Sequence, residues 1–177
     1  PAPEAARHYA EIAEIQAGAV DLFICETMAS VDQARGALLG LEGAGVPVWL
    51  AVTTDDRDGS RLRSGEPVTD ILPLVERFGP AAVLVNCTRP EATTRALSEL
   101  GGRGLVLGAY ANGFTAIEEA YRSPTATVEA LSARTDLGPA RYADFAAEWV
   151  AEGATIIGGC CEVGPAHVAE LARQFGP

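Results

Sequence analysis

Three of the four cysteines follow directly after predicted strands. Cys87 comes after the apolar run 82–86, and Cys160 and Cys161 come after the run 155–159. Because the carboxyl ends of parallel strands meet at one edge of a sheet, we expect these three side chains to converge there. Three thiolates suit Zn²⁺, which binds sulfur at about 2.3 Å in tetrahedral geometry, and three protein ligands leave one position for a substrate. The pattern predicts an open zinc site.

The adjacent pair Cys160-Cys161 sets a condition on the backbone. Neighbouring residues of a regular strand point to opposite faces, so both sulfurs reach one ion only if the chain bends there. Gly158 and Gly159 permit such a bend, since glycine reaches backbone angles that other residues avoid. Two other interpretations remain open. Cysteines at strand ends also serve as buried apolar fillers, and the pair could form a strained vicinal disulfide, which a reducing compartment disfavours.

The remaining candidates for chemistry are weaker. Cys25 is expected to face the covering helices as a small buried hydrophobe. Its neighbour Glu26, at the end of a predicted strand, either caps the next helix or holds a substrate ammonium. His8 and His167 do not follow strands, so we expect surface or capping roles for them. The acidic run 55–59 lacks the full ligand pattern of a calcium loop and is expected to be a solvated turn.

The elements that must position these residues alternate along the chain. Their spacing predicts helices over 4–18, 31–41, 68–78, 90–100, 141–152 and from 165 onward, strands over 21–26, 46–52, 82–86, 105–111 and 155–159, and capping boxes at Ser30/Gln33 and Thr88/Glu91. The segment 112–139 is expected to be a long loop with a helical turn or two. Alternating strands and helices require parallel pairing through right-handed crossovers. Two architectures fit: an open doubly wound sheet and part of a (β/α)₈ barrel.

Composition excludes several classes of function. The 177 residues include 24 acidic and 13 basic side chains, which give a formal net charge of −11. Such a surface repels phosphate backbones and anionic lipid, so we expect neither a nucleic-acid partner nor a membrane. No apolar run reaches the length of a membrane span, and the amino terminus shows no signal-peptide pattern. The cysteine usage favours a reducing compartment, so the sequence predicts a single-domain cytoplasmic protein.

Four short motifs, taken together, resemble the homocysteine S-methyltransferase family. They are Cys-Glu-Thr at 25–27, Val-Asn-Cys at 85–87, Tyr-Ala-Asn-Gly at 110–113 and Gly-Gly-Cys-Cys at 158–161. The resemblance implies a (β/α)₈ TIM barrel that binds zinc and methylates homocysteine to methionine. It also implies that residues 1–177 are the carboxyl-terminal portion of the barrel domain and supply its fourth to eighth strands.

Carried over by motif, the resemblance implies a role for each matching residue. Cys87, Cys160 and Cys161 would be the zinc ligands, and Glu26 and Asn112 would bind substrate, with Glu26 at the homocysteine amino group. The partners would be homocysteine and a small methyl donor. S-methylmethionine or S-adenosylmethionine is favoured, while betaine and a folate-linked cobalamin partner remain open.

The chain departs from the family in two places. The family's Tyr-Pro-Asn-Ser-Gly loop is replaced here by residues 110–114, Tyr-Ala-Asn-Gly-Phe, and the family's first strands, with an Asp-Gly motif, have no counterpart. We therefore expect an exposed sheet edge that the missing amino-terminal strands or another chain would cover. The alternative function is a non-catalytic zinc- or redox-binding half-barrel, or a degenerate paralogue.

Overall fold

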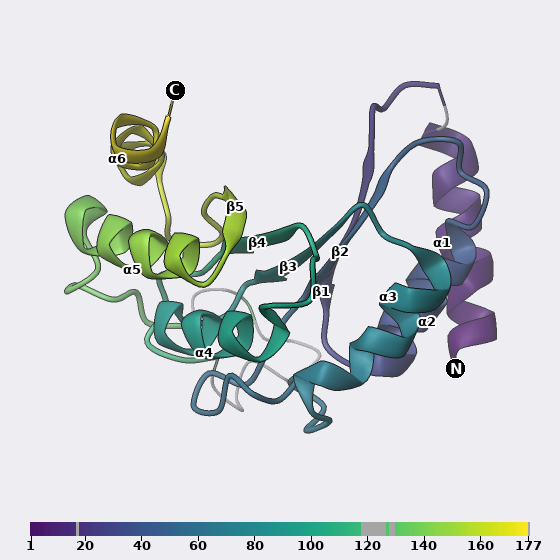
Figure 1. The fold of residues 1–177 in the computed structure, drawn as a ribbon, viewed down its shortest axis with the longest axis horizontal. Helices are drawn as coiled ribbons and strands as arrows, with labels where there is room; N and C mark the ends of the chain where they lie inside the picture. The colour runs from purple at the N-terminus through teal and green to yellow at the C-terminus, as the bar shows by residue number, and fades with distance from the viewer. Residues whose placement is uncertain (17, 118–126, 128–129, 177) are drawn as a thin grey trace.

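Five parallel strands form one sheet in the computed structural model, which describes residues 1–16, 18–117, 127 and 130–176. The strands are β1 (Phe23–Met28), β2 (Val48–Val52), β3 (Ala82–Asn86), β4 (Leu107–Tyr110) and β5 (Ala154–Ile157). Their order across the sheet is their order along the chain (Figure 1). The pairing is regular at β2 and β3, where Leu50 lies opposite Val83, and irregular in β1 between Cys25 and Met28.

Helices lie between successive strands, before the first and after the last, and they form an arc around one face of the sheet (Figure 1). They are α1 (Ala2–Gln16), α2 (Val31–Gly40), the 3-10 turn η1 (Val68–Ile71), α3 (Leu72–Phe78), α4 (Pro90–Leu100), α5 (Pro139–Ala151) and α6 (Pro165–Phe175). Helix α1 packs on α2, and α5 packs on both α4 and α6. None of the helices in the described ranges is both long and apolar enough to cross a bilayer.

The strand order decides between the two architectures that fit the sequence. A doubly wound sheet reverses its strand order at a switch point and carries helices on both faces. Here the order runs β1 to β5 without reversal, and the helix layer covers one face. The prediction of five consecutive βα units of a (β/α)₈ barrel is therefore confirmed.

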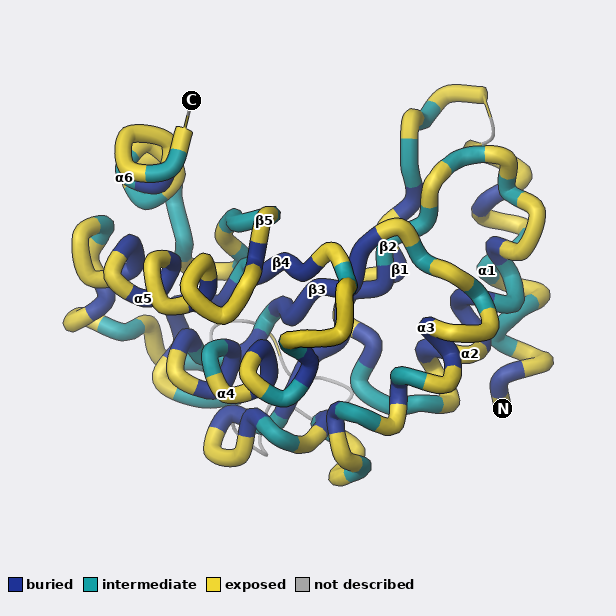
Figure 2. Tube along the Cα trace, in the orientation of Figure 1, coloured by how far each residue is buried: buried dark blue, intermediate teal, exposed yellow. Residues whose placement is uncertain are grey.

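The core lies mainly between the sheet and its helices. Apolar side chains on that face, among them Leu50 and Val83, are almost fully buried together with Tyr142 and Trp149 of α5, as the dark blue strands and helix sides in Figure 2 show. The opposite face carries a smaller cluster that includes Leu84. Three partly buried side chains pack against this cluster: Trp49, Tyr110 and Ile156.

The two outer strands leave unpaired edges within the described residues, because β1 pairs only with β2 and β5 only with β4. On β1, Ile24 is 44% exposed although it belongs to a strand. An open edge with an apolar side chain is a surface that proteins normally cover. The expectation of an exposed sheet edge is consistent with this arrangement.

The two predicted capping boxes differ in how far the structure bears them out. Half of the capping box at Ser30 is present: Ser30 Oγ accepts a hydrogen bond from Gln33 N at 3.1 Å, whereas Gln33 Oε1 accepts from Ala29 N rather than from Ser30 N. The box predicted at Thr88 is wrong: α4 has Arg89 as its N-cap residue without a side-chain cap, and Thr88 bonds to the neighbouring strand ends instead. The long loop predicted over 112–139 falls partly on 118–126 and 128–129, which lie outside the described residues.

Candidate metal centre

Cys87 sits in a turn with unusual backbone geometry at the carboxyl end of β3. Its φ is 49°, in the left-handed region, which costs a residue other than glycine about 1 kcal/mol. Its N–H still donates to Tyr110 O at 3.3 Å, so the turn begins while the chain is attached to β4. The surrounding structure must hold Cys87 in this conformation.

Cys160 and Cys161 follow β5 in a segment that keeps contact with the end of β4. Cys160 N donates to Ala111 O at 3.0 Å, and Gly113 N donates to Cys161 O at 2.8 Å. The predicted bend is present, but neither preceding glycine uses a positive φ. Gly159 is required for a different reason: a Cβ there would lie 2.2 Å from Val163 Cγ1, so only glycine permits this close approach.

The three sulfur atoms converge as the sequence predicted. Cys87, Cys160 and Cys161 have sulfurs that all lie within 4.8 Å of one another, and the Cys160 and Cys161 sulfurs are 3.8 Å apart. Tetrahedral zinc with sulfur ligands at about 2.3 Å sets adjacent sulfurs about 3.8 Å apart. Within the described ranges, no fourth His, Cys, Asp or Glu joins this cluster. The donor set therefore fits a zinc ion with one open position.

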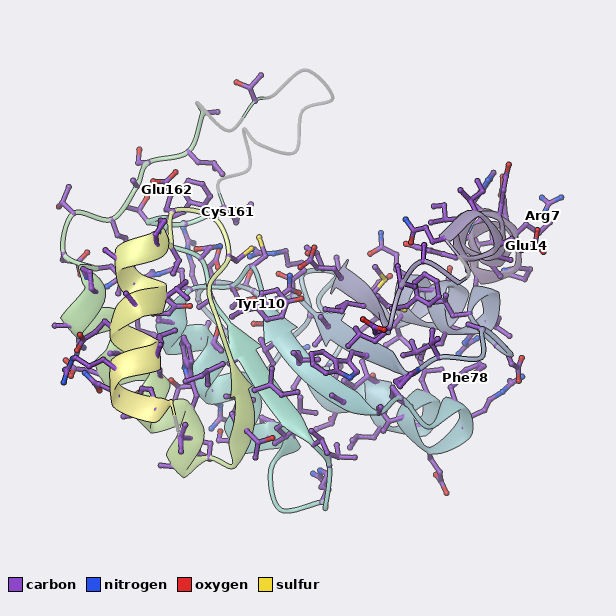
Figure 3. The ribbon with its side chains drawn as sticks, turned by 90° about the horizontal axis from the view of Figure 1, so that it is seen from above. Arg7, Glu14, Phe78, Tyr110, Cys161 and Glu162 are labelled. Atoms are coloured by element: carbon purple, nitrogen blue, oxygen red, sulfur yellow. The ribbon has the colours of Figure 1, made fainter. Side chains whose placement is uncertain are left out.

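The sulfur cluster lies at an accessible end of the sheet. Figure 3 shows Cys161 and Tyr110 near one another there, with several sulfur atoms beside Cys161. Cys161 is exposed, whereas Cys87 and Cys160 are half-buried. The cluster is therefore open to solvent at Cys161.

The thiols differ in how readily they ionise. A hydrogen bond from Cys160 lowers the pKa of Cys87, and giving that bond raises the pKa of Cys160. Burial raises the pKa of Cys161. Because metal ligation requires thiolates, metal binding to this cluster must displace the protons of the three thiols.

Glu26 lies on β1 beside the same end of the sheet. Its side chain is exposed, and no hydrogen bond to it is present among the described residues. Burial raises the pKa of the Tyr110 hydroxyl, and the nearby Glu26 carboxylate and the cysteine sulfurs add to this. Glu26 therefore sits close enough to Tyr110 to help raise the pKa of its hydroxyl.

Asn86 links the Glu26 segment to the cysteine turn. It is fully buried; its Nδ2 donates to Thr27 Oγ1 at 2.8 Å and its Oδ1 accepts from Thr27 N at 3.1 Å. Thr27 needs this support because its φ of 61° is also left-handed. Asn86 receives no role from the sequence alone, although a side-chain amide directly before a strand-end cysteine indicates a residue that could support the turn.

Asn112 lies behind the cluster and is fully buried. Its Oδ1 accepts from Phe114 N at 3.1 Å, and its side chain lowers the pKa of Cys87, although Nδ2 has no hydrogen-bond partner. In this chain Asn112 adjoins Cys87 from the protein side. Substrate binding by Asn112 stays a prediction.

The other sequence candidates lie away from the sulfurs. Cys25 is 3% exposed, and burial raises its pKa to about 12, which confirms the prediction of a small buried hydrophobe. His8 is exposed, and His167 Nε2 lies 2.9 Å from Leu137 O and edge-on to Tyr142. Both histidines are thus outside the cluster.

The acidic run 55–59 is only partly the solvated turn that was expected. Asp55 forms that turn, since its Oδ1 accepts from Arg57 N at 2.8 Å. The prediction is wrong for Asp56, which is only 8% exposed and pairs with Arg63. Nothing in the sequence distinguishes Asp56 from its acidic neighbours, because its burial depends on segments far along the chain.

A cavity opens beside Cys87. Its volume is about 500 Å³, and it is lined by Thr27, Ala29, Ser30, Gln33, Thr53, Arg63, Ser64, Cys87 and Ile117. This volume is in the range of small-molecule sites. A second hollow of about 420 Å³ lies around Val46 and Ala81, near the amino ends of β2 and β3, and contains no cysteine.

Comparison with known proteins gives a consistent answer. The family model described as homocysteine S-methyltransferase matches residues 2–175. Homocysteine S-methyltransferase of Escherichia coli (strain K12) is 33% identical over 164 residues, covering 90% of this chain and 49% of that protein. Homocysteine S-methyltransferase 4 of Zea mays is 29% identical, with 90% and 46% covered.

Solved structures agree with the sequence relatives. The homocysteine methyltransferase MmuM from Escherichia coli in its apo form has a TM-score of 0.69 at 26% identity, covering 95% of this chain and 56% of that one. Its metallated form has a TM-score of 0.71 at 25% identity, with 96% and 52% covered. The chain thus spans about half the length of these proteins. With its motifs, its five barrel units and its cysteine cluster, it belongs to the homocysteine S-methyltransferase family.

Proposed function

We propose that this chain is the carboxyl-terminal part of a zinc-dependent enzyme that transfers a methyl group to the sulfur of homocysteine. The observation that carries the proposal is the convergence of the Cys87, Cys160 and Cys161 sulfurs within 4.8 Å, in a chain of this family. The relatives are about twice as long, so the activity belongs to a protein that also contains the other barrel units.

The three cysteines are proposed to hold zinc and to leave one position for the substrate sulfur. When bound, zinc lowers the pKa of a coordinated thiol and so keeps it as a thiolate at neutral pH. Cys87, Cys160 and Cys161 add negative charge around that position, which keeps the substrate sulfur electron-rich. The exposed carboxylate of Glu26 is proposed to pair with the homocysteine ammonium, and Asn112 to support the site from behind Cys87.

The transfer balances without a redox partner. A new sulfur–methyl bond forms on homocysteine as the bond between the methyl group and the onium centre of the donor breaks. The electron pair of the broken bond stays with the donor, which leaves with one positive charge fewer. The thiolate loses its negative charge, and methionine is the product.

A cationic sulfonium donor such as S-methylmethionine or S-adenosylmethionine is proposed. The chain carries a net charge of −11, which favours the approach of cations. The cavity beside Cys87, which includes the apolar side chain of Ile117, offers space for such a donor. Free thiols at the site suit a reducing compartment, and we propose the cytoplasm.

The test uses the protein that contains this chain together with its upstream barrel units. We expect zinc in the purified protein and methionine formation with a sulfonium donor, and we expect Cys160→Ala to lose both. The matched control is Cys25→Ala, which removes the buried cysteine of β1 that lies in the core between the sheet and the helices. Full turnover without zinc, or in Cys160→Ala, would refute the proposal. Zinc without turnover for any donor would favour the non-catalytic half-barrel.

A further inference from the structure

Two side chains of opposite charge, Arg63 and Asp56, form hydrogen bonds with the backbone of the turn at Cys87. The guanidinium of Arg63 donates from Nη2 to Cys87 O at 2.8 Å. Two residues further along, Arg89 N donates to Asp56 Oδ1 at 3.1 Å. The cation thus meets a carbonyl and the anion meets an N–H of the same turn, and each contact is charge-assisted.

The two charged side chains also bind each other. Arg63 pairs with Asp56 through two hydrogen bonds of 3.2 Å, with side chains 16% and 6% exposed. Both oxygens of Asp56 are fully used, because Oδ2 also accepts from Ile117 N at 2.8 Å. Every oxygen of the carboxylate therefore has two donors, and the pair is a fixed element of the structure.

A threonine completes the support of the Cys87 carbonyl. Arg63 Nε donates to Thr53 Oγ1 at 2.9 Å, and Thr53 Oγ1 donates to Cys87 O at 3.2 Å. Thr53 and Arg63 both lie in the loop that follows β2, and this loop supplies no cysteine. The loop is itself braced by the bridges Thr54–Leu62 and Arg61–Pro67.

The hydrogen bonds from Arg63 and to Asp56 act on a turn whose backbone is in the left-handed region. Cys87 has a φ of 49°, and its conformation sets the direction of its sulfur toward Cys160 and Cys161. Stability alone explains the pair poorly, because buried ion pairs often stabilise a fold no better than apolar side chains of the same volume. A planar guanidinium with several donors can fix a carbonyl and a carboxylate at once.

We propose that Arg63 and Asp56 are positioning residues that hold the Cys87 sulfur at the metal position shared with Cys160 and Cys161. The inference rests on the proposed metal site and adds two residues outside the cysteine motifs to it. Replacing a residue that orients a metal ligand without touching the ion typically lowers metal affinity by about 10- to 100-fold.

The test is a Co²⁺ titration of the chain within the protein that also contains its upstream barrel units, followed by competition with Zn²⁺. Sulfur-to-cobalt charge-transfer absorption reports how many thiolates bind. We expect Arg63→Met to lower the affinity about 10- to 100-fold and to reduce the band toward that of Cys87→Ala. Arg61→Met is the matched control, since Arg61 is an exposed arginine two residues away that pairs with Asp58.

The outcomes separate the inference from the proposed function. No thiolate band in the unsubstituted chain would refute the metal site and the inference with it. A normal band and affinity in Arg63→Met, beside binding by the unsubstituted chain, would refute the inference alone. If far-UV circular dichroism shows that Arg63→Met does not fold, Arg63→Lys and Asp56→Asn decide: we expect weakened binding in both, and unchanged binding in both would refute the inference.

Discussion

Two buried threonines near the cysteine turn allow a sharp test of the hydrogen-bond network. Thr88 and Thr93 are both fully buried. Thr88 Oγ1 accepts from Thr54 N at 2.9 Å and donates to Asn86 O at 3.0 Å. Thr93 Oγ1, in contrast, has no hydrogen-bond partner among the described residues. The same substitution to valine therefore removes a fully used hydroxyl at one position and an unused one at the other.

The two variants should change stability in opposite directions. Thr88→Val leaves the N–H of Thr54, itself fully buried, without a partner. An unsatisfied buried donor costs about 1–3 kcal/mol, so we expect a loss of about 2 kcal/mol. Thr93→Val replaces a buried hydroxyl that has no partner with a methyl group, and we expect a gain of about 1 kcal/mol.

Urea unfolding at 25 °C of the metal-free chain, followed by circular dichroism, measures both changes. For a chain of this size, the loss in Thr88→Val corresponds to a melting temperature lower by about 4–8 °C. Thr88→Ser is the control that keeps the hydroxyl, and we expect it to be less destabilised than Thr88→Val. Equal effects of valine at both positions would refute the hydrogen-bond assignment.

Two further predictions concern charge and packing. Hydrogen bonding to Arg134 lowers the pKa of Asp136 to about 2. A depressed folded pKa gives stability above the unfolded value of about 3.9, which is lost as pH falls toward 2. Asp136→Asn should therefore be less stable than the unsubstituted chain at pH 7 in chemical denaturation, and the difference should shrink as pH falls from about 4 through 2; a difference that does not shrink over this range would contradict this. A Cβ at Gly59 would lie 2.0 Å from the backbone oxygen of Ala92, so Gly59→Ala should lose about 1–3 kcal/mol or more. Gly138, the N-cap residue of α5 with free space around its Cβ position, is the control, and Gly138→Ala should lose less stability than Gly59→Ala in the same unfolding assay.

The sequence alone determined which elements form and which residues stand at their ends. Apolar periodicity placed all five strands, and Ala82–Asn86 was predicted with its observed bounds. Periodicity is a local property, so it is readable without the fold. A local signal failed at Thr88, because its hydroxyl meets Thr54 from a different strand rather than the first turn of α4. The buried N–H of Thr54 has no access to water, so the Thr88 hydroxyl bonds to it rather than to an N–H in the first turn of α4.

Only the tertiary structure showed the strand order and decided the details of the site. The alternation of strands and helices left two sheet topologies open, the family motifs predicted the barrel, and the observed strand order agrees with that prediction. The sequence placed three cysteines at one edge, but the 3.8 Å between the Cys160 and Cys161 sulfurs depends on backbone held by β4. Asp56 was read as a solvated turn residue, yet it is buried because Arg63, Arg89 and Ile117 all reach it. The contacts from Arg89 and Ile117 join segments remote in sequence, and their geometry exists only once the sheet has formed.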